Sequence, residues 1–145
     1  MARLSTVEID IFLTSASPDQ RDIVRTLREL ITRRADGLTE RVSRDKALTG
    51  YLVYEGPGDQ MVFAIGLTGG RTVTLHLGPY DGSRQLQDQC GAAFGPFQVG
   101  KGTLRFGDPA ELPVAAISAV VDATAGYLGP SVPAQKAPAK KRRWR

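Results

Sequence analysis

The sequence has very little of the chemistry on which metal and redox sites depend. Its 145 residues include one cysteine, Cys90, and one histidine, His76. A single cysteine excludes a disulfide within the chain, and a single histidine excludes a site built from several histidines. A Cys90–His76 nucleophile pair would require the fold to bring the two side chains together. The simpler interpretations are a small buried side chain for Cys90 and a structural or surface role for His76.

Long hydrophobic runs are also missing. No apolar run approaches the roughly 20 residues of a membrane-spanning helix. Glu8 and Asp10 interrupt the apolar stretch near the N-terminus, where a signal peptide would be uncharged. The length is that of one domain. We therefore expect a cytoplasmic protein with a single domain over residues 1–128.

The domain has no excess of positive charge, and the excess of the whole chain belongs to the tail. The formal net charge is +4, but the last ten residues carry six cations and no acid, so 13 basic and 15 acidic residues remain elsewhere. Residues 129–145 have little to bury besides Trp144, which predicts a disordered basic tail. Such a tail would bind nucleic-acid phosphates without sequence preference, and Trp144 would stack on a base. The candidate nucleic-acid-binding residues are Lys140, Lys141, Arg142, Arg143, Trp144 and Arg145. The alternative is a solubilising extension.

Helices are predicted at both ends of the domain. Ser17 and Pro18 are an N-cap and a first-turn proline, and an apolar stripe follows, which predicts a helix over residues 18–35. The stretch before it has apolar residues at helical spacing (Ile9, Phe12, Leu13, Ala16) but also alternates, so a strand competes there. A short helix at 82–90 and a closing helix at 111–128 are expected.

The middle of the chain is rich in strand signals. The pair Gly69-Gly70 separates two β-rich segments and predicts a two-residue hairpin turn. In the second of these segments Thr72, Thr74 and His76 share the more polar face. The fold class predicted is α+β, an antiparallel sheet of about five strands with two N-terminal helices and one C-terminal helix packed on it. The expected strands are 38–44, 50–54, 61–68, 71–78 and 103–106.

Residues 95–103, GPFQVGKGT, have the glycine and lysine spacing of a phosphate-binding P-loop. A P-loop requires a strand that leads through a glycine-rich turn into a helix N-terminus. Here Pro96 has no N–H to offer, and TLRFGDP after the turn is β-like. We interpret the stretch as a glycine-flanked turn that enters an edge strand, and we reject a nucleotide site.

Some cations of this region remain candidates for binding an anionic ligand. Lys101 and Arg105 would lie on the same side of an extended segment, and Arg71 from the hairpin is a further candidate. The predicted ligand-binding residues are Lys101, Thr103, Arg105 and Arg71, and no cofactor is predicted.

Three stretches resemble the YdhG-like bacterial family, domain of unknown function 1801: VEIDIFLTSASPDQRDIVRTLRELI (7–31), VTLHLGP (73–79) and VGKGTLRF (99–106). The resemblance covers about residues 5–128. It implies an α+β fold and no established catalytic activity, and some relatives are described as frataxin-like iron chaperones. SRDKALTG (43–50) stands where the family usually has a Trp/Tyr-Gly-Met-Pro-like turn, so ligand contacts of that turn are not carried over.

Iron delivery of the frataxin kind would use exposed carboxylates, because hard cations favour oxygen ligands. The candidates are Glu8, Asp10, Asp19, Asp22 and Glu29. Arginines are interleaved with them, so helix capping and i,i+4 pairs such as Arg25–Glu29 are the favoured interpretation, and no metal site is predicted. The function expected is that of a non-catalytic accessory or binding domain, with frataxin-like metal handling as one version. The alternatives are a nucleic-acid-associated protein that acts through its tail, or an enzyme with an unrecognised site.

Overall fold

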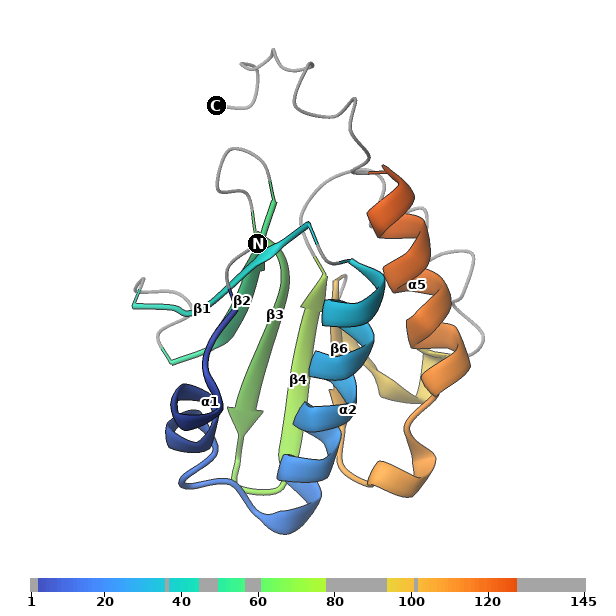
Figure 1. Cartoon of the computed structure of the whole chain (residues 1–145). Helices are drawn as coiled ribbons and strands as arrows, with labels where there is room; N and C mark the ends of the chain where they lie inside the picture. Colours follow the sequence, from blue (N-terminus) through green and yellow to red (C-terminus); the bar gives the residue numbers. More distant parts are fainter. Residues whose placement is uncertain are drawn as a thin grey trace.

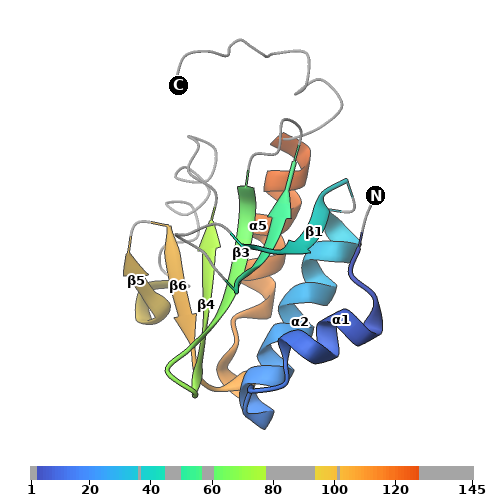
Figure 2. The same cartoon turned by 90° about the vertical axis from the view of Figure 1, so that its left-hand side faces the viewer.

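The computed structural model describes residues 3–35, 37–44, 50–56, 61–77, 94–100 and 102–127. Within them the chain forms an α+β fold, a six-stranded sheet with helices on one side (Figures 1 and 2). The predicted helix at 82–90, Cys90, Lys101 and the tail at 129–145 lie outside the described residues. The elements are α1 (Thr6–Phe12), α2 (Pro18–Arg34), β1 (Thr39–Val42), β2 (Leu52–Glu55), β3 (Met61–Thr68), β4 (Thr72–Leu77), η3 (Gly95–Phe97), β5 (Gln98–Gly100), β6 (Thr103–Phe106), η4 (Pro109–Glu111) and α5 (Val114–Tyr127).

The segment that precedes α2 forms the helix α1, so the strand that its alternating pattern also allowed does not form. Ser5 caps α1 through a capping box, in which its hydroxyl accepts from the Glu8 N–H and the Glu8 carboxylate accepts from the Ser5 N–H. This reciprocal pair satisfies two backbone donors that a helix start leaves open. Ile9 and, just after the helix, Leu13 are buried and attach α1 to the core.

The helix predicted at 18–35 is confirmed as α2. Ser17 and Gln20 form a second capping box, and Pro18 occupies the first turn. Gln20 is itself buried, and its side-chain amide donates to the Thr72 carbonyl over 2.8 Å. This hydrogen bond ties the start of α2 to β4. The residues that α2 buries are Gln20, Ile23, Val24, Leu27, Ile31 and Thr32.

The sheet is antiparallel throughout, with the strand order β1-β2-β3-β4-β6-β5. Gly69 and Gly70 have positive φ angles of 60° and 76° and lie in the turn between β3 and β4, so the predicted hairpin is confirmed. The prediction of a two-residue turn is wrong, because Thr68 pairs with Thr72 and the loop consists of Gly69, Gly70 and Arg71. The sequence predicted about five strands. The additional one, β5, is a three-residue edge strand with an irregular register against β6, too short for an alternating pattern.

The rejection of a P-loop agrees with the described backbone. Thr103 begins β6, which pairs antiparallel with β4 and with β5. No helix follows the turn, so no helix dipole is available there for a phosphate. The turn does not enter the edge strand as predicted: β6 lies one position inside the edge, which β5 forms.

The helices cover one face of the sheet, and the main core lies between the two layers (Figure 2). Tyr54, Phe63 and Phe106 are its largest fully buried aromatic side chains from the sheet. The closing helix was predicted from residue 111 but α5 begins at Val114, because Pro113 disfavours a helical conformation at Leu112. The opposite face is more polar, as predicted, yet its centre is buried at Val53, Ala64 and Thr74.

Candidate functional site

Among the described residues a hollow lies between α1 and α2, and a buried carboxylate on β1 lies beneath it. The side chain of Glu40 is only 1% exposed. Arg28 of α2 donates to both of its oxygens, from Nε to Oε2 over 2.8 Å and from Nη2 to Oε1 over 3.0 Å. The Tyr54 hydroxyl donates to Oε2 over 2.6 Å, and the Leu4 N–H donates to Oε1 over 2.9 Å. One carboxylate therefore joins β1, β2, α2 and the segment before α1.

These contacts set the charge states of the cluster. Burial acts to raise the pKa of Glu40, but hydrogen bonds from Arg28, Tyr54 and the Leu4 N–H outweigh it, so the pKa lies below its ordinary value. The hydrogen bond to Glu40 raises the pKa of Arg28. Burial and the neighbouring carboxylate raise the pKa of Tyr54. At neutral pH the cluster is an ion pair capped by a neutral phenol.

The N-terminal segment contacts both this cluster and α2. Arg28 Nη2 also donates to the Leu4 carbonyl over 3.2 Å, so both backbone groups of Leu4 are bound. One residue earlier, Arg3 donates from Nη2 to the Thr32 carbonyl at the C-terminal end of α2, over 2.7 Å. The segment before α1 is thereby fixed at both Arg3 and Leu4, and it forms one wall of a hollow.

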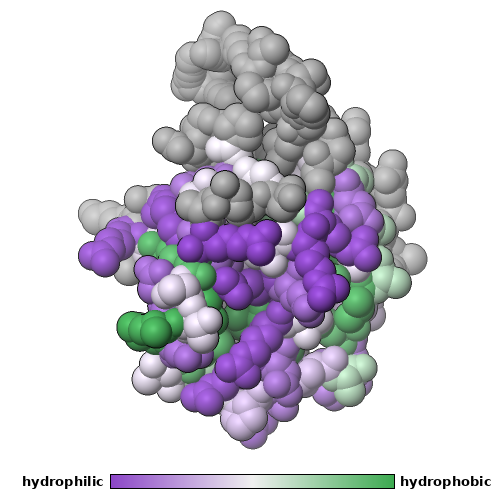
Figure 3. All heavy atoms as spheres, in the orientation of Figure 1, coloured by the Kyte–Doolittle hydropathy of each residue, from purple (hydrophilic) through white to green (hydrophobic). Residues whose placement is uncertain are grey.

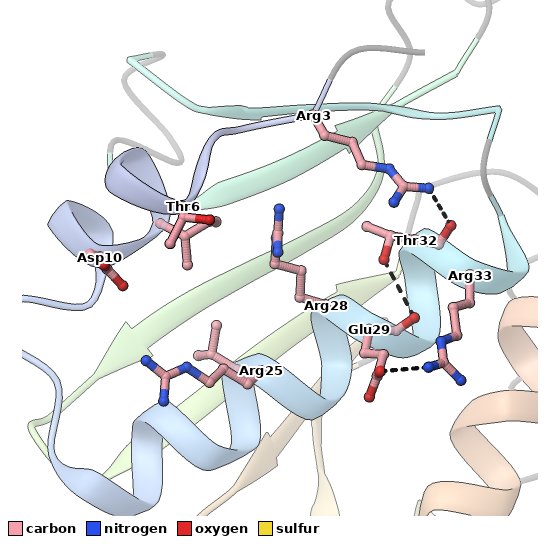
Figure 4. A pocket seen from close by; sticks show the side chains of 10 residues that line it. Arg3, Thr6, Asp10, Arg25, Arg28, Glu29, Thr32 and Arg33 are labelled. Atoms are coloured by element: carbon pink, nitrogen blue, oxygen red, sulfur yellow. Dashed lines mark hydrogen bonds and ion pairs between the residues drawn. The ribbon is translucent and has the colours of Figure 1, made fainter.

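This hollow, the α1–α2 groove, has a volume of about 530 Å³. Its lining includes the apolar residues Ile9 and Val24, and most of the other lining side chains are charged (Figure 4). The lining residues are Arg3, Thr6, Ile9, Asp10, Val24, Arg25, Arg28, Glu29, Thr32 and Arg33.

The α1–α2 groove carries a surplus of positive charge. Four arginines line it against two carboxylates, and the cations still outnumber the acids by four to three when Glu40 beneath it is counted. Glu29 is bound to Arg33 over 2.9 Å, and in Figure 4 this pair lies on the side of α2 away from Arg3. Arg25 is exposed and has no ion pair or side-chain hydrogen bond with the described residues. An exposed guanidinium without a partner in the described part of the chain is suited to bind an anionic ligand.

The pair predicted between Arg25 and Glu29 does not form, since Glu29 pairs with Arg33 instead. Both choices are one helical turn away, and a glutamate placed N-terminal to its cation is the better orientation. A partial signal for the groove was present in the sequence, because Arg25, Arg28 and Thr32 are spaced to share one face of α2. Nothing in their spacing indicated that Arg3 and α1 would close the other side.

The ligand-binding residues predicted from sequence lie elsewhere, on the sheet face opposite the helices. Thr103 is paired with His76, and Arg105 with Thr74, so Thr103 and Arg105 share this face. Arg105 is exposed. Arg71 lies in the turn before β4, three positions or roughly 10 Å of strand from Thr74. The described residues thus bring Thr103 and Arg105 together but give Arg71 no contact with them, and their role in binding stays a prediction.

His76 lies in a small cluster on the same face. Its Nδ1 is 3.2 Å from the Thr103 hydroxyl, and its ring centroid is 5.5 Å from that of Tyr51. Burial lowers the pKa of His76, which favours the neutral ring. A hydroxyl at Nδ1 and a neighbouring aromatic ring therefore hold one side of the imidazole in place.

The carboxylates considered for iron have local roles or stay apart. Glu8 is used in the α1 capping box, and Asp19 lies in the first turn of α2. Glu29 is paired with Arg33. Within the described ranges no group of three or more His, Cys, Asp or Glu side chains is placed to hold a metal ion.

Comparison with known proteins gives no further assignment. No protein-family model, curated protein or solved structure matches the chain. The resemblance to the YdhG-like family therefore stays a prediction. In the described part of the chain no helix is both long and apolar enough to cross a bilayer.

Proposed function

We propose that the protein is a non-catalytic cytoplasmic binding domain that takes an anionic ligand in the α1–α2 groove. The observation that supports this best is Arg25, an exposed guanidinium without a partner among the described residues, at a groove with a surplus of arginines. Arg28 adds to it, because Nε and Nη2 are used for Glu40 and Leu4 while Nη1 remains for a ligand. The parallel N–H donors of a guanidinium group match two oxygens of a carboxylate or phosphate group.

The charge of the groove also favours an anion over a metal ion. A cation placed there would face four guanidinium groups, and Glu29 and Glu40 are already engaged by arginines. The metal-handling version of the function implied by the family resemblance is therefore less well supported by this groove than anion binding.

Charge reversal at Arg25 is expected to weaken anion binding by about tenfold, which corresponds to the loss of one charged contact of roughly 1.4 kcal/mol. The probes are inorganic pyrophosphate and citrate, titrated by calorimetry and by the rise in melting temperature at low ionic strength. Arg25→Glu should fold normally, because Arg25 is exposed and unpaired within the described chain.

Arg21→Glu is the matched control, since Arg21 is an exposed arginine one turn earlier on α2 that does not line the groove. It makes the same change in net charge, so a general electrostatic effect would appear in both variants. Equal affinities of Arg25→Glu and Arg21→Glu, or the absence of binding to the wild-type protein at millimolar anion, would contradict the proposal.

A second candidate function concerns the basic tail, which lies outside the described residues. Six cations among the last ten residues favour salt-sensitive binding to nucleic acid. Removal of residues 134–145 is then expected to abolish retention on immobilised DNA at low salt. The full-length chain at raised salt is the control. Unchanged retention after the deletion would exclude this function for the tail.

A further inference from the structure

The outer side of α1 carries an apolar pair that the fold does not use. Val7 and Ile11, one helical turn apart on α1, are 65% and 67% exposed. Ile9 and Leu13 make the core contacts of this region, so Val7 and Ile11 are not needed to hold α1 in place. Isolated exposed apolar residues are ordinary, but an aligned pair beside a binding groove widens the surface that a partner can cover.

The position of this pair relative to the groove follows from helix geometry. Thr6 and Asp10 line the α1–α2 groove, and Val7 and Ile11 are the next residues along the chain. Successive residues of an α-helix are rotated by about 100°. The apolar pair therefore forms the strip of α1 adjacent to the groove rim, on the solvent side. Hydrophobic atoms gather at the α1 edge of this face, next to hydrophilic side chains of α2 (Figure 3).

We infer that the ligand of the α1–α2 groove is an acidic, amphipathic segment of a partner protein; this inference rests on the proposed function. Its carboxylates bind Arg25 and Arg28, and its apolar side chains pack on Val7 and Ile11. A ligand that reaches both the groove and the full length of α1 must span about 10 Å, the length of a seven-residue helix. A peptide segment of two helical turns meets this requirement, with charge complementary to the arginines.

An anionic membrane surface is the competing class of partner, and α1 fits it poorly. Helices that lie on membranes carry Lys and Arg on their polar face. The sequence of α1, TVEIDIF, has none, and its two charged residues are the acids Glu8 and Asp10. A flat lipid surface would bring anionic headgroups against these acids, whereas a peptide segment can hold its carboxylates at Arg25 and Arg28 of α2.

The test uses a random dodecapeptide phage library, panned against the immobilised full-length protein. Enriched peptides are expected to combine Asp or Glu with Leu, Ile or Phe. Their affinity should fall about fivefold in the double variant Val7→Ser/Ile11→Ser and about tenfold in Arg25→Glu. Val114→Ser is the matched control, because Val114 is an exposed apolar residue at the start of α5 (43%) and should have no effect.

Circular dichroism checks that each variant is folded. The inference is overturned if no peptide is enriched, if the enriched peptides lack acidic residues, or if they bind the Val7/Ile11 double variant as tightly as the wild type. It is also overturned if phosphatidylserine vesicles bind the wild type but not that variant. Pyrophosphate binding that depends on Arg25, without enrichment of acidic peptides, would remove this inference and leave the proposed function standing.

Discussion

Replacing Glu40 with alanine is expected to lower the free energy of unfolding by about 3 kcal/mol. The change removes the acceptor of three donors at once: the Arg28 guanidinium, the Tyr54 hydroxyl and the Leu4 N–H. The Arg28 side chain is only 27% exposed, so its charge would be left partly buried without a counterion. Urea denaturation measures the effect as a shift of the midpoint at constant slope.

Glu29→Ala is the control, because Glu29 also pairs with an arginine but in solvent, where such pairs contribute less than about 0.5 kcal/mol. The pH dependence supplies an independent readout. The pKa of Glu40 is lowered in the folded state, so its contribution is fully present above its unfolded value, roughly 4.3, and is lost as pH falls through the lower folded value. The wild type should therefore lose stability below about pH 4 more steeply than Glu40→Ala. Parallel acid curves, or equal losses in the two alanine variants, would show that the buried cluster does not stabilise the fold.

Substitution of Gly66 by alanine is expected to cost about 1 kcal/mol, because the new Cβ forces the half-buried Tyr51 ring to move. Gly66 lies in β3 opposite Tyr51 in the register with β2, and the Tyr51 ring lies directly over it. A Cβ at this position would overlap with Cε2 and Cζ of that ring, so the ring must leave its place beside His76.

Gly37→Ala is the control for the loss of a glycine, since a Cβ there meets nothing within 4 Å. Its effect should be within about 0.5 kcal/mol of zero. Adding Tyr51→Ala to Gly66→Ala should recover part of the loss, because the clash is removed. A double-mutant cycle measures this coupling, and strictly additive effects would contradict the packing argument.

The elements predicted best from the sequence are those whose signals are local. Ser17-Pro18 and Gly69-Gly70 need only their own backbone conformations to define a helix start and a hairpin turn. The edge strand β5 was missed because three residues beside a 3-10 turn have no periodicity to detect. Residues 111–113 were wrongly assigned to the last helix, since the apolar pattern was followed past Pro113.

The candidate site was harder to predict because it depends on contacts distant in sequence. In the sequence, Glu40 is one polar residue of the predicted strand 38–44. Its partners Leu4 and Arg28 are 36 and 12 residues away, so no local pattern links them. The arginines of α2 were interpreted as i,i+4 partners of acids on the same helix, but Arg28 pairs with Glu40 of β1. Only the packing of α1 against α2 turns some of these side chains into the wall of a groove.

The short outermost strands of the sheet disfavour self-association of the protein through strand pairing. Its longest strand, the eight-residue β3, is paired on both sides, while the outermost strands have three and four residues. The β5 border has an irregular register, and the β1 border carries the Arg41–Glu55 ion pair just inside it. Short, irregular and charged borders are poor templates for the addition of a strand from a neighbouring molecule. The apolar stretch MVFAIGLT is thus paired on both sides within the sheet and withheld from intermolecular pairing.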